Sequence, residues 1–203
     1  PNKPMIVSIS YNTDLLAMEN LFPMVSRWIE FARTRKNLII EIRTKSSFFH
    51  SIKDMKPSKS IILSWTLSPE EICKEYEIGA PPLLKRLNAV SNALDKGWRV
   101  RLCFDPILLI NNWETIYNQF IDDVFSQIKT DKLRDVTIGV FRMNKDYFNR
   151  IRKQGSRSAL YYKNYVIEEG TVTLEKNERQ EALNKIERKI GHYLPEDKIL
   201  MWS

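Results

Sequence analysis

Short apolar runs alternate with amphipathic segments along most of the chain. Five of these runs are rich in β-branched and aromatic residues and stop at polar residues, which is typical of buried strands. The expected strands cover residues 5–10, 37–44, 60–67, 98–104 and 136–141. The segments that follow them carry apolar residues three or four positions apart, as amphipathic helices do.

The helical segments fill most of the space between the expected strands. They cover 15–35 with a break at Pro23, 47–56 as a short helix or turn, 81–96, 113–128 and 144–153. A further helix is expected to start at Ser68-Pro69-Glu70-Glu71, with Ser68 as its cap and Pro69 in its first position. Strands that lead into helices predict an α/β fold with a parallel sheet and right-handed crossovers. An open doubly wound sheet and part of a (β/α) barrel both satisfy this order.

The last fifty or so residues follow a different pattern. Residues 159–174 contain two β-prone runs around Glu168-Glu169-Gly170, which predicts a β-hairpin. Residues 175–194 form a charged amphipathic segment, which predicts a helix. The flexible-looking junction at 155–158 therefore divides the chain into a main part, 1–155, and a C-terminal hairpin and helix extension of the same domain, 156–203.

Each expected strand delivers a hydroxyl group, an acid or a base to its carboxyl end. Because the carboxyl ends of parallel strands meet at one rim, these side chains are expected to lie close together. One polar residue at a strand end is ordinary, but five on one rim indicate a site for a charged, polar small molecule. The five residues are Ser10, Lys45, Ser64, Asp105 and Arg142.

Composition narrows the classes of function. The net charge is +7, which favours a polyanionic partner such as nucleic acid. No apolar run approaches the roughly 20 residues that cross a bilayer, and no signal peptide pattern is found, so a cytoplasmic protein without a membrane partner is expected. The six glycines form no phosphate-binding motif. The two cysteines, Cys73 and Cys103, cannot supply a complete zinc or iron–sulfur ligand set.

Several short segments occur together in an order that is known from one enzyme family. They are 64–69, Glu77 and 82–89, then 97–100 with 104–107, then Thr44-Lys45, Ser10 to Asp14, and the pair Trp113 and Tyr117. The first group resembles the pattern S-x-x-x-x-P … E-x-G-[TA]-x-x-L-x-x-R-[LI]-x-A, and the second resembles G-[YW]-x-[LV] … F-[DA]-P-I. The chain resembles the spore photoproduct lyases, a radical-SAM family, from about Ser8 to Arg142.

This resemblance implies a partial (β/α) barrel of the radical-SAM type, with S-adenosylmethionine bound inside. In such enzymes a 4Fe-4S cluster cleaves S-adenosylmethionine to a 5′-deoxyadenosyl radical, which abstracts hydrogen from a thymine dimer of the spore type in DNA. Carried over position by position, Ser10, Lys45 and Ser64 would line the cofactor pocket, with Lys45 meeting the cofactor carboxylate. Glu77 and Arg86 would form a buried structural pair.

The resemblance also implies contacts with DNA. The basic surface and the tail hairpin would meet the nucleic acid, and Asp105 and Arg142 would lie on the substrate side of the site. Tyr161, Tyr162 and Lys163 could stack against an opened lesion or wedge into it. An ordinary aromatic patch in the core is the alternative for these tail residues.

Two departures from the family pattern change the expectation. The CxxxCxxC cluster motif lies upstream of every matched segment and is missing from this chain, so the 4Fe-4S ligands are expected in an upstream segment or a second polypeptide. Tyr11 stands where the lyases carry a hydrogen-donating cysteine, directly after the serine matched by Ser10. Tyr11 is therefore a candidate hydrogen donor, and the substrate could be a relative of the thymine dimer.

Three hypotheses follow from the sequence. The first is the C-terminal part of a radical-SAM lyase, inactive by itself, whose first strand would expose an edge. The second is a stand-alone, degenerate α/β domain that binds nucleic acid or a partner chain without catalysis. The third is a different α/β enzyme or small-molecule binder that shares only the polar strand ends.

Overall fold

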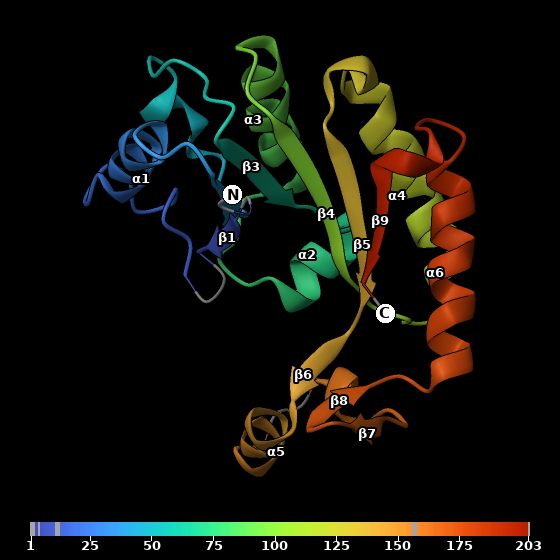
Figure 1. Cartoon of the computed structure of the whole chain (residues 1–203). Coiled ribbons are helices and arrows are strands. Elements are labelled where there is room, and N and C mark those ends of the chain that lie inside the picture. Colours follow the sequence, from blue (N-terminus) through green and yellow to red (C-terminus); the bar gives the residue numbers. More distant parts are fainter. Residues whose placement is uncertain (1–2, 4, 11–12, 156–157, 203) are drawn as a thin grey trace.

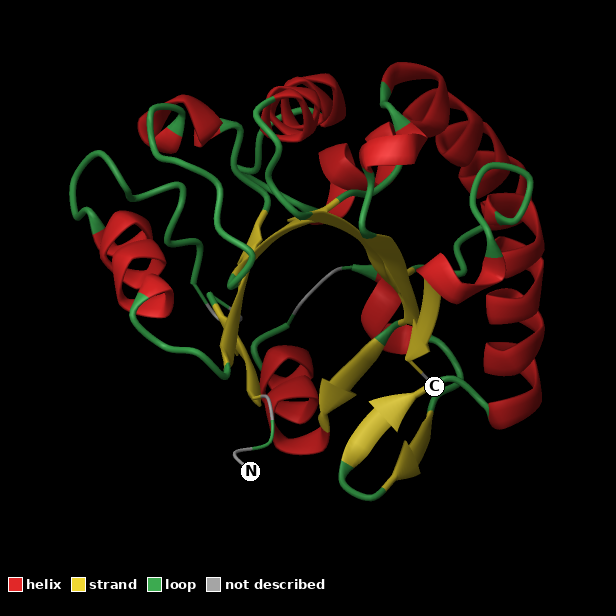
Figure 2. Ribbon diagram, turned by 45° about the horizontal axis from the view of Figure 1, so that its top comes forward, coloured by secondary structure: helices red, strands yellow, loops and turns green. Residues whose placement is uncertain are grey.

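A curled, six-stranded parallel sheet forms the body of the protein (Figures 1 and 2). The computed structural model describes residue 3 and residues 5–10, 13–155 and 158–202. The strands lie in the order β1 (Met5–Ile9), β2 (Leu38–Thr44), β3 (Ile61–Thr66), β4 (Val100–Ile107), β5 (Asp135–Val140) and β9 (Ile199–Trp202). The five expected strands are all present, and the curl of the sheet confirms the partial barrel over the open, doubly wound alternative.

Helices cover the convex side of the sheet (Figure 2). The α-helices are α1 (Met24–Arg33), α2 (Glu70–Tyr76), α3 (Leu83–Asp95), α4 (Trp113–Gln127), α5 (Lys145–Lys153) and α6 (Lys176–Ile190). Short 3₁₀ turns are η1 (Phe48–Ile52), η2 (Thr130–Lys132), η3 (Ala159–Tyr162) and η4 (Glu196–Lys198). No helix among the described residues combines the length and the apolar character that a membrane crossing requires.

The side chains of each strand alternate between the two faces of the sheet. In β3, Ile61, Leu63 and Trp65 belong to the apolar core, which also contains buried residues of α1, α3, α4 and α6. The intervening residues Ser64 and Thr66 occupy the opposite, concave face, where the neighbouring strands also carry polar and charged residues. The sequence thus forms a sheet with one apolar and one polar face.

A small annex extends from the carboxyl end of β5 (Figure 1). We use "the annex" for the antiparallel sheet β6 (Arg142–Asn144), β8 (Thr171–Thr173) and β7 (Val166–Glu168), together with α5 and η3. The predicted hairpin is present as β7–β8, with positive φ angles at its turn, 47° at Glu169 and 80° at Gly170. The annex combines segments from both sides of the predicted boundary at 155, so the division into 1–155 and 156–203 remains a prediction.

Two local expectations were wrong, and two strands were missed. Ser68 does not cap α2, because Pro69 is the cap residue and the Ser68 hydroxyl donates to Glu77 instead. Tyr161 and Tyr162 lie in η3, before the hairpin rather than within it. The sequence analysis also missed two strands, β6 and β9, each of four residues or fewer.

The first strand has one partner within the described part of the chain, since β1 pairs only with β2 there. Met5 and Ile6 of β1 are 61% and 58% exposed, although both are apolar. This is the exposed edge that the sequence predicts.

Candidate functional site

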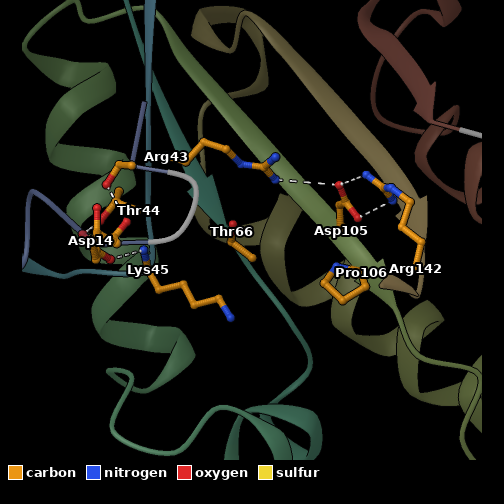
Figure 3. A pocket seen from close by; sticks show the side chains of 10 residues that line it. Asp14, Arg43, Thr44, Lys45, Thr66, Asp105, Pro106 and Arg142 are labelled. Atoms are coloured by element: carbon orange, nitrogen blue, oxygen red, sulfur yellow. Dashed lines mark hydrogen bonds and ion pairs between the residues drawn. The ribbon is translucent and has the colours of Figure 1, made fainter. Parts of the chain in front are cut away.

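A cavity of about 460 Å³ opens at the carboxyl ends of the parallel strands (Figure 3). It lies on the concave face, where the segments that follow β1 and β2 approach the carboxyl end of β4 and the start of β6. Its lining contains both acids and bases, together with four hydroxyl side chains. The lining residues are Ser10, Thr13, Asp14, Arg43, Thr44, Lys45, Thr66, Asp105, Pro106 and Arg142.

Asp14 joins the first loop of the cavity to the end of β2. Its Oδ1 accepts a hydrogen bond from Thr44 Oγ1 at 2.8 Å, and its Oδ2 accepts one from the Lys45 backbone N–H at 2.7 Å. Ser10 adopts a left-handed conformation with φ of 68°, and its Oγ donates to the Thr13 carbonyl and accepts from the Leu15 N–H. These bonds hold Ser10 and Asp14 in place, so this part of the cavity wall is preorganised.

Asp105 and Arg142 form the opposite wall (Figure 3). Arg142 donates from both terminal nitrogens to the two carboxylate oxygens of Asp105, each at 2.9 Å, which is the bidentate geometry of a strong charge-assisted pair. Arg43 Nη2 approaches Asp105 Oδ2 at 3.7 Å from the other side. A Cβ atom at Gly139 would lie 2.7 Å from Arg142 Nη1 and 2.9 Å from Asp105 Oδ1, so only glycine leaves room for this pair.

Lys45 links the cavity to a buried ion pair. Its Nζ lies 2.9 Å from Glu77 Oε1, and Glu77 Oε2 lies 2.6 Å from Arg86 Nη2 as an ion pair without hydrogen-bond geometry. Burial alone would raise the pKa of Glu77, but Lys45 and Arg86 outweigh burial and hold that pKa below its usual value. Arg86 is fully buried and donates to the carbonyl groups of Pro81 and Thr66. The predicted Glu77–Arg86 structural pair is therefore confirmed by geometry.

Ser64 lies on the same face of the sheet but outside this cavity. It is fully buried, and its hydroxyl donates to Glu41 Oε1 at 2.7 Å. Glu41 also accepts from Arg101 Nη1 at 3.2 Å, and Arg101 makes a bidentate contact with Asp135 at 2.6 and 2.9 Å. Thr66, two residues further along β3, lines the cavity instead. The cofactor role of Ser64 remains a prediction.

The tail residues occupy two different environments. Tyr161 packs against Phe148 with ring centroids 5.6 Å apart, whereas the Tyr162 side chain is 56% exposed beneath Arg152. Lys163 donates from Nζ to the carbonyl of Leu109, and burial lowers its pKa. None of the three lines the cavity, so their contacts with a lesion remain predictions, and Tyr11 lies outside the described residues.

The sequence analysis did not single out Arg43, Asp14 or Thr66 as site residues. A usable signal exists for Arg43, because it lies two positions before Lys45 in a strand and therefore shares its face. Asp14 offers no comparable signal, since its position depends on hydrogen bonds to β2, thirty residues away. Thr66 and Ser64 lie on the same face of the strand, and the sequence does not tell which of the two hydroxyl groups lines the cavity.

The described residues do not fit an iron–sulfur cluster. Within this part of the chain, no group of three or more His, Cys, Asp or Glu side chains could hold a metal ion. Burial raises the pKa of the Cys73 thiol to about 11, with Glu77 adding to the effect, and burial also raises the pKa of the Cys103 thiol. Both shifts disfavour the thiolate that an iron–sulfur cluster requires.

Comparison with known proteins settles the family. The family model described as spore photoproduct lyase matches residues 4–202. The chain belongs to the spore photoproduct lyase family. This confirms the resemblance seen in the sequence, although no curated protein sequence matches the chain.

Solved structures of spore photoproduct lyase share the fold of this family member. A mutant of the lyase superimposes with a TM-score of 0.85 at 16% sequence identity, over 98% of this chain and 61% of that chain. The same four values describe a mutant with dinucleoside spore photoproduct and a double mutant with bound AdoMet and dinucleoside spore photoproduct. The chain thus spans about three fifths of the length of these lyase structures.

Proposed function

We propose that this chain is the C-terminal part of a spore photoproduct lyase-like radical-SAM enzyme that repairs a thymine-dimer lesion in DNA or a related substrate. It would supply the S-adenosylmethionine and lesion side of the repair site. The 4Fe-4S cluster would be ligated outside this chain, by an upstream segment or a second polypeptide. The observation that carries the proposal is the mixed-charge cavity at the strand ends of a chain of this family.

The cavity has the chemistry that S-adenosylmethionine requires. This cofactor joins a carboxylate, an ammonium group and a sulfonium ion to a ribose diol, and it would supply the radical chemistry when bound. The Lys45 ammonium, 40% exposed, is available to its carboxylate. The carboxylates of Asp14 and Asp105 offer acceptors to cationic and hydroxyl groups of the cofactor. We propose Lys45 and Ser10 as cofactor-binding residues, whereas Ser64, which the resemblance also implies, lies outside the cavity and is tested separately.

Arg142 is the residue we propose to meet the lesion. Its guanidinium donates to both Asp105 oxygens and to the Val140 carbonyl, and it has two further N–H donors for the carbonyl oxygens of a thymine ring. Asp105 holds this guanidinium in place before substrate arrives, and Gly139 leaves the space that the pair occupies. Preorganised donors of this kind bind polar rings without reorganisation at the time of binding.

Tyr11 is proposed as the hydrogen donor that replaces the family cysteine. It follows Ser10, which lines the cavity. Its phenol would give a hydrogen atom to a product radical, and the tyrosyl radical left behind would take a hydrogen atom back from the 5′-deoxyadenosine formed in the first abstraction. Tyr11→Phe, which removes only the hydroxyl group, would abolish turnover in the enzyme completed with its cluster segment, and it would leave cofactor affinity within twofold of the parent.

Calorimetric titration of S-adenosylmethionine into the 203-residue chain tests the proposal. Lys45→Met is expected to weaken binding by about tenfold or more, because a charge-assisted hydrogen bond is lost. Lys53→Met is the matched control, since Lys53 lines a separate cavity with Phe49 and His50. Failure of the folded chain to bind, or equal losses in both variants, would contradict the proposed cofactor site.

The intact mass of the protein in its source cells decides where the cluster is held. A mass clearly above 24.0 kDa supports an upstream cluster segment in the same polypeptide. A mass that matches this chain means that repair needs a second polypeptide or is absent, and the second outcome favours a domain that binds nucleic acid or a partner chain without catalysis. We expect the larger mass, together with a cytoplasmic location because the substrate is DNA.

A further inference from the structure

The exposed face of α5 gathers basic side chains. The helix has four basic residues and one acid, Asp146. Phe148, which is 4% exposed, anchors the helix to the rest of the annex. The Asn144 side chain caps the first turn of the helix by accepting from two backbone N–H groups. The basic side chains all point to solvent on the rest of the helix surface. They are Lys145, Arg150, Arg152 and Lys153.

Two of the arginines are held over exposed aromatic rings. The Arg150 guanidinium lies 4.9 Å from the centroid of Tyr147, and that of Arg152 lies 5.5 Å from the centroid of Tyr162. The rings of Tyr147 and Tyr162 are 48% and 56% exposed. A guanidinium group that lies over an aromatic ring keeps the N–H donors at its own edge accessible to phosphate oxygens. Alternating cations and rings are the composition of a surface that binds a nucleic acid strand.

Several basic residues elsewhere on the surface are paired with acids, whereas those of α5 have no such partner among the described residues. Lys129 and Lys132 both pair with Asp95, and Lys189 pairs with Asp122. Within the part of the chain that the structure describes, no ion pair joins a basic side chain of α5 to an acid. The positive charge of this face is therefore not neutralised locally, and it remains available to an anionic partner.

The hairpin is a poorer phosphate-binding surface than α5. Its turn carries Glu168 and Glu169, both exposed, and Glu168 already pairs with Arg179 at 3.1 Å. Carboxylates at this position would repel phosphates. This charge pattern favours the helix over the hairpin as the DNA-contacting element of the annex.

The position of α5 fits a strand that leaves the cavity. The helix begins at Lys145, directly after β6, and β6 begins at Arg142 on the cavity wall. Three residues of extended chain span about 10 Å, the rise of about three nucleotides of one DNA strand. Figure 1 shows α5 below the carboxyl ends of the main strands, on the side of the rim.

We propose that α5, with Tyr162, binds the sugar–phosphate backbone of the DNA strand next to the lesion. The inference rests on the proposed function, since it takes the cavity as the place of the lesion. The phosphates would lie against Arg150, Arg152 and Lys153, and an unstacked base would lie on Tyr162. Substrate affinity would then come from two separate surfaces, the cavity for the lesion itself and α5 for the flanking strand.

The test compares a DNA substrate with a substrate that has no flanking phosphates. The double variant Arg150→Gln/Lys153→Gln removes two charges from α5, and Lys53→Gln/Lys96→Gln removes two from the separate cavity on the helix-covered side. The affinities of both variants are measured for a lesion-containing oligonucleotide over a salt series, and for dinucleoside spore photoproduct. Circular dichroism confirms that both variants fold.

The α5 variant is expected to lose about tenfold or more in affinity for the oligonucleotide. The slope of log affinity against log salt concentration is expected to become shallower by about two. Its affinity for the dinucleoside stays within twofold of the parent, and the control variant binds both ligands normally. Tyr162→Ala is expected to weaken oligonucleotide binding about fivefold without a change in salt dependence.

Three results would overturn the inference. Unchanged oligonucleotide affinity in the α5 variant removes it and leaves the proposed function intact. An equal loss for the dinucleoside means that α5 acts through the cavity rather than through phosphates. If the parent chain binds neither ligand, the proposed function fails and the inference fails with it.

Discussion

Two charged clusters share the concave face of the sheet and differ in what surrounds them. The buried row consists of Glu41, Ser64, Arg101 and Asp135, and each of these residues is less than 9% exposed. The rim cluster consists of Arg43, Lys45, Asp105 and Arg142, which line the cavity. The two clusters contain the same kinds of charge within a few residues of each other along the same strands.

The difference lies in whether the protein completes the coordination of its own charges. In the buried row, Arg101 contacts two carboxylates and Glu41 accepts from two donors, so the charges that were taken out of water are compensated. In the rim cluster, Lys45 is 40% exposed and the Arg142 side chain is 31% exposed. The first arrangement stabilises the fold and the second can bind a ligand, which gives different expectations for matched substitutions.

Removal of the central charge of the buried row has the largest expected effect. Arg101→Met would leave Glu41 buried without its cation and Asp135 with Arg134 alone, and lower the free energy of unfolding by about 3–5 kcal/mol. Arg142→Met at the rim would lower it by about 1 kcal/mol or less, because the Arg142 side chain is 31% exposed and Asp105 keeps Arg43 at 3.7 Å. Urea denaturation of both variants measures the two values. Equal losses would erase the distinction between the clusters.

Glu77 joins the rim to the interior, and its effect depends on pH. Its folded pKa is lowered by Lys45 and Arg86 against the effect of burial, so its carboxylate stabilises the fold above the unfolded pKa of about 4.3. This stabilisation is lost as the pH falls through the folded pKa. Glu77→Gln is therefore expected to cost about 2 kcal/mol at pH 7, and less below about pH 4.

Thermal unfolding between pH 3 and pH 7 follows this difference. Glu175→Gln is a suitable comparison because Glu175 is an exposed cap of α6 without a buried cation. A stability gap for Glu77→Gln that stays constant down to pH 3 would show that the carboxylate is not the stabilising group.

Gly139 tests the rim by steric means. Gly139→Ala places a methyl group against Arg142 and Asp105, which must separate or shift. We expect a stability loss of about 1–2 kcal/mol and a loss of about tenfold or more in affinity for dinucleoside spore photoproduct. Gly191→Ala is the control, since its Cβ would make only ordinary contacts of 3.4 Å at the end of α6. Normal lesion binding by Gly139→Ala would separate Arg142 from substrate recognition.

The smallest effects are expected for Ser64→Ala, which is compared with Thr66→Val on the same strand. Ser64→Ala removes one buried hydrogen bond to Glu41, which costs about 1 kcal/mol of stability. Because the hydroxyl belongs to the buried row, we expect S-adenosylmethionine affinity to stay within twofold. Thr66→Val, on the same strand and in the cavity, is expected to weaken that affinity more. The opposite order would assign Ser64 to the cofactor pocket, as the sequence suggested.

The alternation of residues in a strand predicted the faces of the sheet but not depth along it. Lys45, Asp105 and Arg142 were expected together from their positions at strand ends, and they share one cavity. Ser64 and Thr66 have the same parity, so only the three-dimensional rim separates them. Tyr161 and Tyr162 are neighbours in sequence, and packing against Phe148 distinguishes them.

Long-range contacts account for what the sequence could not predict. Strand β9 has only four residues and follows a short turn, so its signal is weak until it pairs with β5, more than sixty residues away. Serine is a common helix-capping residue, but the Ser68 hydroxyl donates instead to the charged, buried Glu77 at 3.0 Å. The capping preference of a serine is overridden where a buried carboxylate needs a hydrogen-bond donor.

A crystal structure of the 203-residue chain with S-adenosylmethionine and dinucleoside spore photoproduct tests the central claim most directly. The account predicts both ligands in the rim cavity, with the cofactor carboxylate within hydrogen-bond distance of Lys45 Nζ and a thymine carbonyl on Arg142. Ligands bound elsewhere, with Lys45 still paired only to Glu77 and Arg142 only to Asp105 and Val140, would contradict it.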